Sequence, residues 1–534
     1  MPPEKLRSTM PAGYVNIKID NQELDHVKLH ALSVKQELNH HSWCHLECRQ
    51  TEDQRFPIEN WLGKNLEILS YDQDGMEHQL FSGFVFEAEL EYEISGSFVA
   101  HVTGASQTYK MDVAPRHAYY FNKTLTDVVQ QLAGRAGLTA VVSCKERRAL
   151  NYAQWGETDF SFLRRLVDDC GGWMRPSPAG IEVYDAFQDG TELLWRGGSG
   201  NKGLLSFSIK GTLSPPSCDG AHYNPHDMTS QTYQGISDSP QFYDSITQLV
   251  DSVQQASKDT MPANYVHDRA RSVTLKDYED RLKKESVRSL GASVQGSGAS
   301  LNQEIRAGNT VQVIGVLDAL GAYGVTQVTH SWDASGYQNQ FACTPWKNYT
   351  APQPPEMKPW GGVVPARVVD QNDPKMMGRV KVRYFWQEEG PTYWARMMTP
   401  HSGGNRGFMF MPEVGDEVVV AFEDGDPERP VVLGCLWNGV DTAPREDFWG
   451  DDIGPNDVKR IVTKSGNRIQ MVDKKGKEAI VMGTPNSVRV ALIANANETG
   501  RETLLLESSV GDIIINAPNG RVHFHCKHFS REVG

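Results

Sequence analysis

The chain has 534 residues, a formal net charge of −14 at pH 7 and eight cysteines. Its length predicts several domains, its acidic balance argues against a nucleic-acid surface, and its scattered cysteines are expected to be buried and reduced. The N-terminus lacks an apolar segment, and no run of about 18 apolar residues occurs, so we expect neither a signal peptide nor a transmembrane helix.

Residues 1–115 predict a first β-barrel. A polar, proline-containing arm over residues 1–12 precedes a series of short alternating runs. Apolar and polar residues that alternate with a period of two indicate half-buried strands, and several such strands in succession are typical of a barrel. The runs lie at 15–19, 43–48, 66–69, 80–86 and 98–104.

Residues 116–200 predict a small α/β insertion, because the hydrophobic period changes there. Thr124 can cap a helix over 124–137, and a second helix is expected from Asp159 to Asp169, followed by a strand at 180–185. The expected buried face of the first helix is Leu125, Val128, Val129 and Leu132, and that of the second is Phe160, Leu163, Leu166 and Val167.

Residues 201–345 predict a second barrel. Strand-like runs occur at 204–209, 273–275, 310–316 and 324–330. A polar stretch at 240–290 interrupts them, and we expect it to be a helical insertion. Residues 346–362 are rich in proline and predict a linker.

Residues 363–440 predict a five-stranded closed barrel. Arg379, Lys381 and Arg383 alternate with apolar residues, so one face of this strand is charged and the other is apolar. Turn-forming residues at 372–374, 403–405 and 424–427 separate the runs. Five short antiparallel strands of this kind are typical of an OB fold.

A second linker is expected at 441–456, and the segment 457–534 has a different pattern. Short apolar runs recur between glycine and asparagine turns, and each is too small to bury its own face. Stacked rungs shared among three chains would solve this, as in a β-helix, and a solenoid within one chain is the alternative. The runs lie at 468–472, 478–482, 488–493, 503–507, 512–516 and 521–525.

Two clusters could bind metal. The acidic turn at 424–430 lacks the ligand spacing of a calcium loop, so we expect a turn between strands with Gly425 at positive φ. His523 and His525 share one face of a strand, and three chains meeting on an axis would present six imidazoles to iron or another divalent ion. In the alternative arrangement Val522 and Phe524 face inward, and both histidines are solvated.

Motifs of catalysis are missing from the sequence. It has no Gly-x-Ser-x-Gly, no His-Glu-x-x-His and no Gly-x-x-x-x-Gly-Lys-Ser/Thr. Its carboxylates are scattered, although a fold could still assemble a pair of them. We therefore expect a protein that is not an enzyme and has no catalytic residues.

Several segments resemble VgrG, the trimeric spike of type VI secretion systems, which is similar to the hub-and-spike proteins of contractile phage tails. Three lie in the expected OB barrel: 373–382 (Asp-Pro-Lys-Met-Met-Gly-Arg-Val-Lys-Val), 411–422 (Met-Pro-Glu-Val-Gly-Asp-Glu-Val-Val-Val-Ala-Phe) and 425–434 (Gly-Asp-Pro-Glu-Arg-Pro-Val-Val-Leu-Gly). Residues 151–166 resemble a further family segment, and 80–86 resembles the first hub barrel.

This resemblance implies a mainly β fold. It consists of two hub β-barrels with a small α/β insertion, an OB-fold barrel and a C-terminal trimeric β-helix or prism needle over 457–534. The implied function is a structural spike at the tip of a contractile injection machine. It would be made in the cytoplasm without a signal peptide, assembled into the apparatus and exported on contraction.

The implied partners are two further copies of the chain, a hexameric tube protein of the Hcp kind, baseplate proteins, secreted effectors and, transiently, the target envelope. No nucleic acid is expected. Because the chain ends soon after the needle, we also expect a tip protein of the PAAR kind to cover it. Its expected contacts are Val522, Phe524, Phe529 and Val533.

The alternative function is a VgrG-like carrier with a hydrolase activity that degrades cell wall. Some related spikes carry a lysozyme insertion after the OB domain or a toxin domain after the needle. The linker after Asn438 and the end of the chain leave little room for either addition. A spike without an enzymatic domain is therefore the expectation.

Overall fold

The computed structural model divides into two compact units, Met1–Leu436 and Trp437–Gly534, which are described separately. No described helix is long and apolar enough to cross a membrane. The described residues are 14–24, 28–50, 58–72, 74–92, 94, 98–145, 149–195, 203–224, 228–238, 241–243, 246–267, 275–316, 321–347, 361–387, 394–444, 456–485, 488–496 and 501–531.

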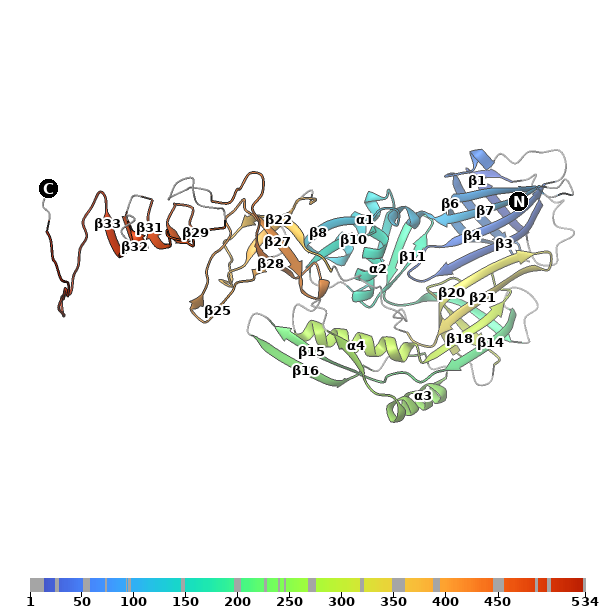
Figure 1. The fold of residues 1–534 in the computed structure, drawn as a ribbon. Helices are drawn as coiled ribbons and strands as arrows, with labels where there is room; N and C mark the ends of the chain where they lie inside the picture. The colour runs from blue at the N-terminus through green and yellow to red at the C-terminus, as the bar shows by residue number, and fades with distance from the viewer. Residues whose placement is uncertain are drawn as a thin grey trace. The chain divides into compact units, whose positions relative to one another are not determined.

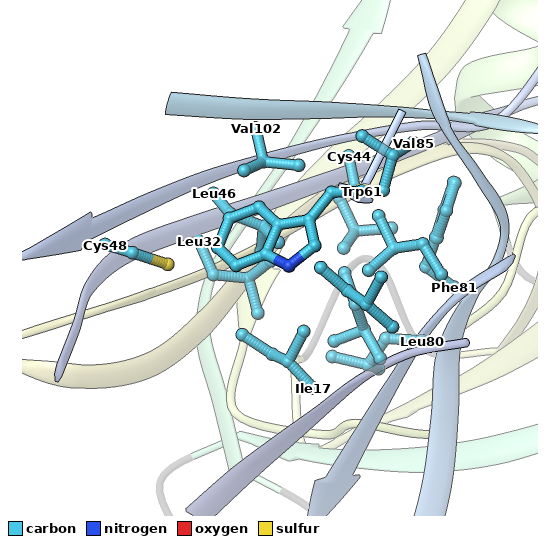
Figure 2. Close-up of a cluster of buried hydrophobic side chains, with 14 of the residues drawn as sticks. Ile17, Leu32, Cys44, Leu46, Cys48, Trp61, Leu80, Phe81, Val85 and Val102 are labelled. Carbon is cyan, nitrogen blue, oxygen red and sulfur yellow. The ribbon is translucent and has the colours of Figure 1, made fainter. Parts of the chain in front are cut away.

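The N-terminal part of unit 1 is a strongly bent antiparallel sheet around one apolar core (Figure 1). Figure 2 shows this core, in which Trp61 lies among aliphatic side chains and Cys44 and Cys48. Among the described residues β1 pairs only with β5 and β2, so this first expected barrel is an open sheet. Its strands are β1 (Tyr14–Ile19), β2 (Gln22–Glu23), β3 (Lys28–Glu37), β4 (Trp43–Gln50), β5 (Asn65–Tyr71), β6 (Glu77–Tyr92) and β7 (Phe98–Ser106).

The second expected barrel is closed. Six strands form a ring in the order β19-β13-β14-β18-β21-β20, which β19 and β20 close by antiparallel pairing. β20 also pairs with β3, so the ring and the first sheet are one continuous 13-stranded sheet. The strands are β13 (Gln188–Trp195), β14 (Gly203–Gly211), β18 (Val294–Ser300), β19 (Asn309–Ile314), β20 (Gly321–Asp333) and β21 (Gly336–Thr344).

The α/β insertion contains both expected helices, α1 (Leu125–Arg135) and α2 (Asp159–Asp169). Thr124 caps α1 through a reciprocal capping box with Asp127, and the expected apolar faces of both helices are buried. The insertion also holds two small sheets. Their strands are β8 (Arg116–Lys123), β9 (Thr139–Ser143), β10 (Leu150–Glu157), β11 (Trp173–Ser177) and β12 (Gly180–Tyr184).

The polar stretch expected to be helical at 240–290 contains α3 and α4, but the insertion also includes a three-stranded sheet, two strands of which precede residue 240. The helix α4 lies against this sheet (Figure 1). Its Tyr278 and Leu282 belong to one buried cluster with Cys218 and Tyr233. Of the strand expected at 273–275, only Leu275 is described, and it begins α4. The elements are β15 (Cys218–Asn224), β16 (Thr229–Ile236), α3 (Thr247–Thr260), β17 (Asn264–His267) and α4 (Leu275–Gly291).

Buried ion pairs join the insertions of unit 1. Arg288 of α4 donates to Asp168 of α2 at 2.8 Å, and Lys284 lies 3.3 Å from the same carboxylate. Arg288 and Asp168 are both about 5 % exposed. The charge of Asp168 is therefore balanced by two cations in a site with little water.

The OB barrel is closed in the order β22-β23-β24-β28-β27, with a parallel pairing between β24 and β28. Val380, Val382 and Tyr384 point into its core, which confirms the alternation expected for this strand. The strands are β22 (Val364–Asp370), β23 (Val380–Tyr384), β24 (Trp394–Met397), β27 (Glu417–Phe422) and β28 (Pro430–Cys435). A hairpin of β25 (Ser402–Gly403) and β26 (Arg406–Gly407) follows β24.

Unit 2 is a five-stranded antiparallel meander in the order β29-β30-β31-β32-β33. Four expected apolar runs form strands, but those at 512–516 and 521–525 are not paired in the single chain. In the part of unit 2 that the structure describes, the single chain forms neither stacked rungs nor the β-helical needle. The strands are β29 (Val458–Val462), β30 (Arg468–Val472), β31 (Ala479–Gly483), β32 (Val488–Ala496) and β33 (Arg501–Ser508).

The expectation that all cysteines are buried is wrong for two of them. All eight are free thiols, and four are fully buried, where desolvation raises the pKa of thiols such as Cys44 and Cys48. Cys435, the last residue of β28, and Cys526, in the segment after β33, are exposed. These two thiols are the ones open to reagents in the single chain.

Candidate functional site

An aromatic joint connects the α/β insertion to the OB barrel within unit 1. Trp155 of β10 lies edge-on to Tyr384, with ring centroids 5.2 Å apart, and its centroid lies 4.7 Å from that of Trp386 and 4.9 Å from that of Phe422. Trp155 is 8 % exposed and belongs to the apolar core of the OB barrel, although it comes from another element. The joint therefore buries side chains of both parts in one core.

The turn between β27 and β28 adds a directed polar contact to this joint. The backbone N–H of Ala153 donates to Oε1 of Glu428 over 3.0 Å, and Arg165 donates to the Ala153 carbonyl over 2.8 Å. Arg165 also pairs with Glu157 at 2.5 Å. Both backbone groups of Ala153 are thus bound by charged side chains, which fixes the position of β10 against the OB barrel.

We predict that Glu428→Ala weakens the joint by about 1–3 kcal/mol, because the buried N–H of Ala153 loses its acceptor. Hydrogen exchange of peptides covering residues 150–157 should become faster, and the melting temperature should fall. Glu428→Gln keeps a carbonyl oxygen at the same place and should change much less. Equal exchange in the two variants would contradict the role of this acceptor.

The sequence segments that resemble VgrG have clear structural roles in the OB barrel. Asp373 accepts hydrogen bonds from the backbone N–H groups of Lys375 and Met377 and from the Arg379 guanidinium. These bonds, that of Arg379 foremost, lower the pKa of Asp373 and hold the loop before β23. The segment 373–379 is therefore a turn built around one carboxylate.

The acidic turn at 424–430 is also held by a hydrogen bond to a carboxylate. Gly425 has φ +72°, which confirms the expected positive angle, and Asp424 also lies in the left-handed region with φ +51°. Asp426 is buried and accepts from the Glu428 N–H over 2.9 Å. No cluster of three or more metal-ligand side chains occurs among the described residues, so the calcium alternative gains no support here.

One face of the unit 2 sheet is apolar and uncovered in the single chain. The strand register aligns its residues in two rows that cross the sheet, and their exposed fractions run from 37 % for Val490 to 64 % for Leu504. The opposite face is covered, with Val472, Val481 and Ala491 buried. The rows are Ile461, Ile469, Met482, Val490 and Leu506, and Met471, Ile480, Leu492 and Leu504.

The residues expected at the tip lie in an extended segment after β33. Val522, Phe524 and Phe529 are exposed by 46 %, 65 % and 73 %. The rings of His523 and His525 are stacked with centroids 6.3 Å apart, so both lie on the same side of the segment, as expected. Val533 lies outside the described residues.

Comparisons with known proteins agree with these features. A family model described as the type VI secretion system/phage-baseplate injector OB domain matches residues 364–437, and one described as the Alg8 N-terminal domain matches residues 11–193. The spike protein VgrG5 of Pseudomonas aeruginosa is 31 % identical over 165 residues, which cover 27 % of this chain and 20 % of VgrG5. VgrG1a of the same species is 35 % identical over 113 residues, which cover 19 % of this chain and 17 % of VgrG1a.

Solved structures share the fold over more of the chain. The c3393 protein of Escherichia coli, described as a type VI secretion component similar to phage T4 gp27 and gp5, has 17 % identity and a TM-score of 0.55 over 79 % of this chain and 99 % of that protein. A chain of the Francisella PdpA–VgrG complex has 10 % identity and a TM-score of 0.60 over 93 % of this chain and 80 % of that one.

The matched segments of this chain span about a fifth of the length of the first curated relatives. The OB domain model matches the part of the chain that forms the closed barrel β22-β23-β24-β28-β27. The chain is therefore similar to the VgrG spike proteins of type VI secretion systems, and its residues 364–437 match the injector OB domain.

Proposed function

We propose that three copies of this chain assemble into a structural spike at the tip of a contractile injection machine. The observation that supports this most is the uncovered apolar face of unit 2, whose nine side chains form two rows across five strands. Monomeric soluble proteins rarely leave a continuous apolar surface of this extent in water. Three such sheets around one axis would cover each other and form the needle over 457–534.

We predict that the purified chain is a trimer at micromolar concentration. The exposed rows would be buried only in the assembly, so dissociated chains should be poorly soluble and should bind hydrophobic dyes. Native mass spectrometry or light scattering measures the mass directly. A folded, soluble monomer under these conditions would contradict both the trimer and the needle.

Within the machine, the 13-stranded sheet of the hub would seat the spike on a hexameric tube protein and on baseplate proteins. Contraction would export the spike from the cytoplasm, drive its needle through the target envelope and carry effectors with it. The hub would supply the transition from sixfold to threefold symmetry. Binding of the purified tube protein to the trimer tests this part of the proposal.

The spike would act without catalysis, because the force comes from contraction of the machine. One relative, the actin cross-linking toxin VgrG1 of Vibrio cholerae, is 28 % identical over 161 residues and is named as a toxin. Those residues cover only 14 % of that protein. Release of fragments from purified cell wall by this chain would instead support the hydrolase alternative.

A tip protein of the PAAR kind would cover the segment from Val522 to Val533. Its exposed aromatic side chains, Phe524 and Phe529, provide apolar contact area, and the unpaired backbone of the described residues 522–531 can accept a further strand. The alternative is closure of three chains around a divalent ion held by His523 and His525. The proposed site would need imidazoles from all three chains, since one chain offers two.

We predict that one experiment distinguishes capping by a tip protein from closure of three chains around a metal ion. Elemental analysis of the trimer should find no stoichiometric metal if a partner covers the tip, and a pull-down should recover the tip protein of the PAAR kind. Phe524→Ser should weaken that capture, whereas His523→Ala should not. About one ion per trimer, lost in His523→Ala and His525→Ala, would contradict the capping proposal.

A further inference from the structure

Ten consecutive exposed residues, 401–410, form an ordered hairpin on the OB barrel. β25 pairs with β26, the Phe408 N–H donates to the His401 carbonyl over 3.0 Å, and the Thr399 hydroxyl donates to the Phe408 carbonyl over 2.8 Å. Gly407 has φ +137°, and a Cβ there would lie 2.3 Å from the His401 oxygen. The hairpin therefore has a specified conformation, and it extends away from the barrel (Figure 1).

The base of this hairpin is apolar and uncovered. Met409 is 86 % exposed, and Met398, Phe408 and Phe410 are exposed by 62 %, 53 % and 62 %. The rings of Phe408 and Phe410 lie 6.4 Å apart, and the Thr399–Phe408 hydrogen bond brings Met398 to the same end of the hairpin. Residues 398–410 contain no acidic side chain and one arginine, Arg406.

These four side chains leave on the order of 400 Å² of apolar surface in water, the size at which a patch usually marks an interaction. A stable interface with a freely diffusing protein needs about 1,000 Å² or more. The patch is thus too small to capture a partner alone, but it suffices for a partner that other contacts already hold nearby. A second copy of this chain in the proposed spike is such a partner.

We propose that this hairpin is a clasp in which Met398, Phe408, Met409 and Phe410 of each copy pack on the OB barrel of the neighbouring copy. The inference rests on the proposed trimer, because threefold symmetry repeats every contact three times around a closed ring. Methionine and phenylalanine suit this role, since they give large contact area and adapt to an uneven surface. The clasp explains why an apolar sequence is held in solvent by a specified turn.

Photo-crosslinking of the full-length chain tests the clasp. A benzophenone amino acid at Phe410 should give covalent dimers and trimers of this chain after irradiation. The same amino acid at Met376, which is 92 % exposed on the loop before β23, should give none. Photo-crosslinking is preferable to thiol reagents because Cys435 and Cys526 are exposed.

Native mass spectrometry of the same samples shows whether the trimer forms, and so distinguishes failure of the clasp from failure of the trimer. A trimer without interchain products at Phe410, or with products at both positions alike, overturns the clasp and leaves the trimer intact. Crosslinks exclusively to an unrelated protein also overturn it. A folded monomer overturns the trimer and the clasp together.

A second variant measures the contribution of the contact. Phe410→Asp should raise the concentration at which the trimer half-dissociates by at least about tenfold, because each copy loses a buried aromatic ring. Met376→Asp should leave this concentration unchanged. Since Phe410 is exposed in the single chain, circular dichroism should show both variants folded, and an unchanged concentration for Phe410→Asp contradicts the clasp.

Discussion

Leu504→Asp is expected to dissociate the trimer, whereas Thr503→Asp on the same strand should be tolerated. Leu504 lies in the uncovered apolar rows of unit 2, and Thr503 points to the opposite face. Both residues are exposed in the single chain, so neither change disturbs its own core. In the assembly, Leu504→Asp would bury three like charges, each at a cost of several kcal/mol.

Analytical ultracentrifugation and thermal melting of the two variants measure this difference. We expect monomers or aggregates for Leu504→Asp and a trimer close to the unmodified one for Thr503→Asp. Leu504→Met, which conserves volume and polarity, should behave like the unmodified chain. If both aspartate variants melt alike, the apolar rows do not face the threefold axis.

Acidification below about pH 6.5 is expected to destabilise the hub through His330. This side chain is 1 % exposed on β20, where burial, with a smaller contribution from Arg306, lowers its pKa to about 3. Nδ1 of the neutral ring accepts from the Tyr337 hydroxyl over 2.6 Å, and that hydroxyl accepts in turn from Asn339. The folded hub therefore keeps His330 neutral where the unfolded chain protonates it.

Acidification lowers the free energy of unfolding because the unfolded chain binds more protons than the folded hub. Between the unfolded pKa near 6.5 and the folded pKa near 3, the unfolded state binds one more proton, so stability falls as the pH falls. The expected loss is about 1.4 kcal/mol per pH unit in this window and nothing above it. His330→Asn removes the titrating group and should flatten this part of the dependence, although it weakens the hub at every pH.

Urea midpoints of the hub at pH 7 and pH 5 provide the measurement. The drop between the two values should be smaller in His330→Asn by about 2 kcal/mol of unfolding free energy. His45→Asn, at an exposed histidine of β4, serves as the matched control and should keep the original drop. An identical drop in all three proteins would show that His330 does not carry this dependence.

Local patterns predicted much of the fold. The capping threonine and the apolar period located α1, and α2 spans the expected residues Asp159–Asp169. Alternation predicted the core face of β23, and the turn residues separated the five OB strands. These features depend on neighbours within about one turn or one strand, which the sequence displays directly.

Contacts between distant segments were not predictable in the same way. The Ala153–Glu428 hydrogen bond joins residues 275 positions apart, and neither local sequence indicates the other. The pairing of β20 with β3 merges two expected barrels into one sheet by the same kind of distant contact. The strand β17 was missed because the polar composition of residues 240–290 favoured helices, and β15 and β16 were missed because they lie before the expected insertion.

The candidate tip shows a further reason for incomplete prediction. The apolar runs at 512–516 and 521–525 have the composition of strands, but the single chain offers them no partner. A strand needs a neighbour to satisfy its backbone groups. Composition therefore predicts the tendency to pair, and the number of chains decides whether pairing takes place.

The joint between Trp155 and the OB barrel has a mechanical consequence. Its packed rings resist compression steeply, because atoms in van der Waals contact repel strongly over fractions of an ångström. Under tension the same rings separate against weak dispersion, and the Ala153–Glu428 hydrogen bond is a directed polar contact across the joint. The hub can thus transmit a forward thrust to the OB barrel as one stiff body, whereas a pull would open it first at β10.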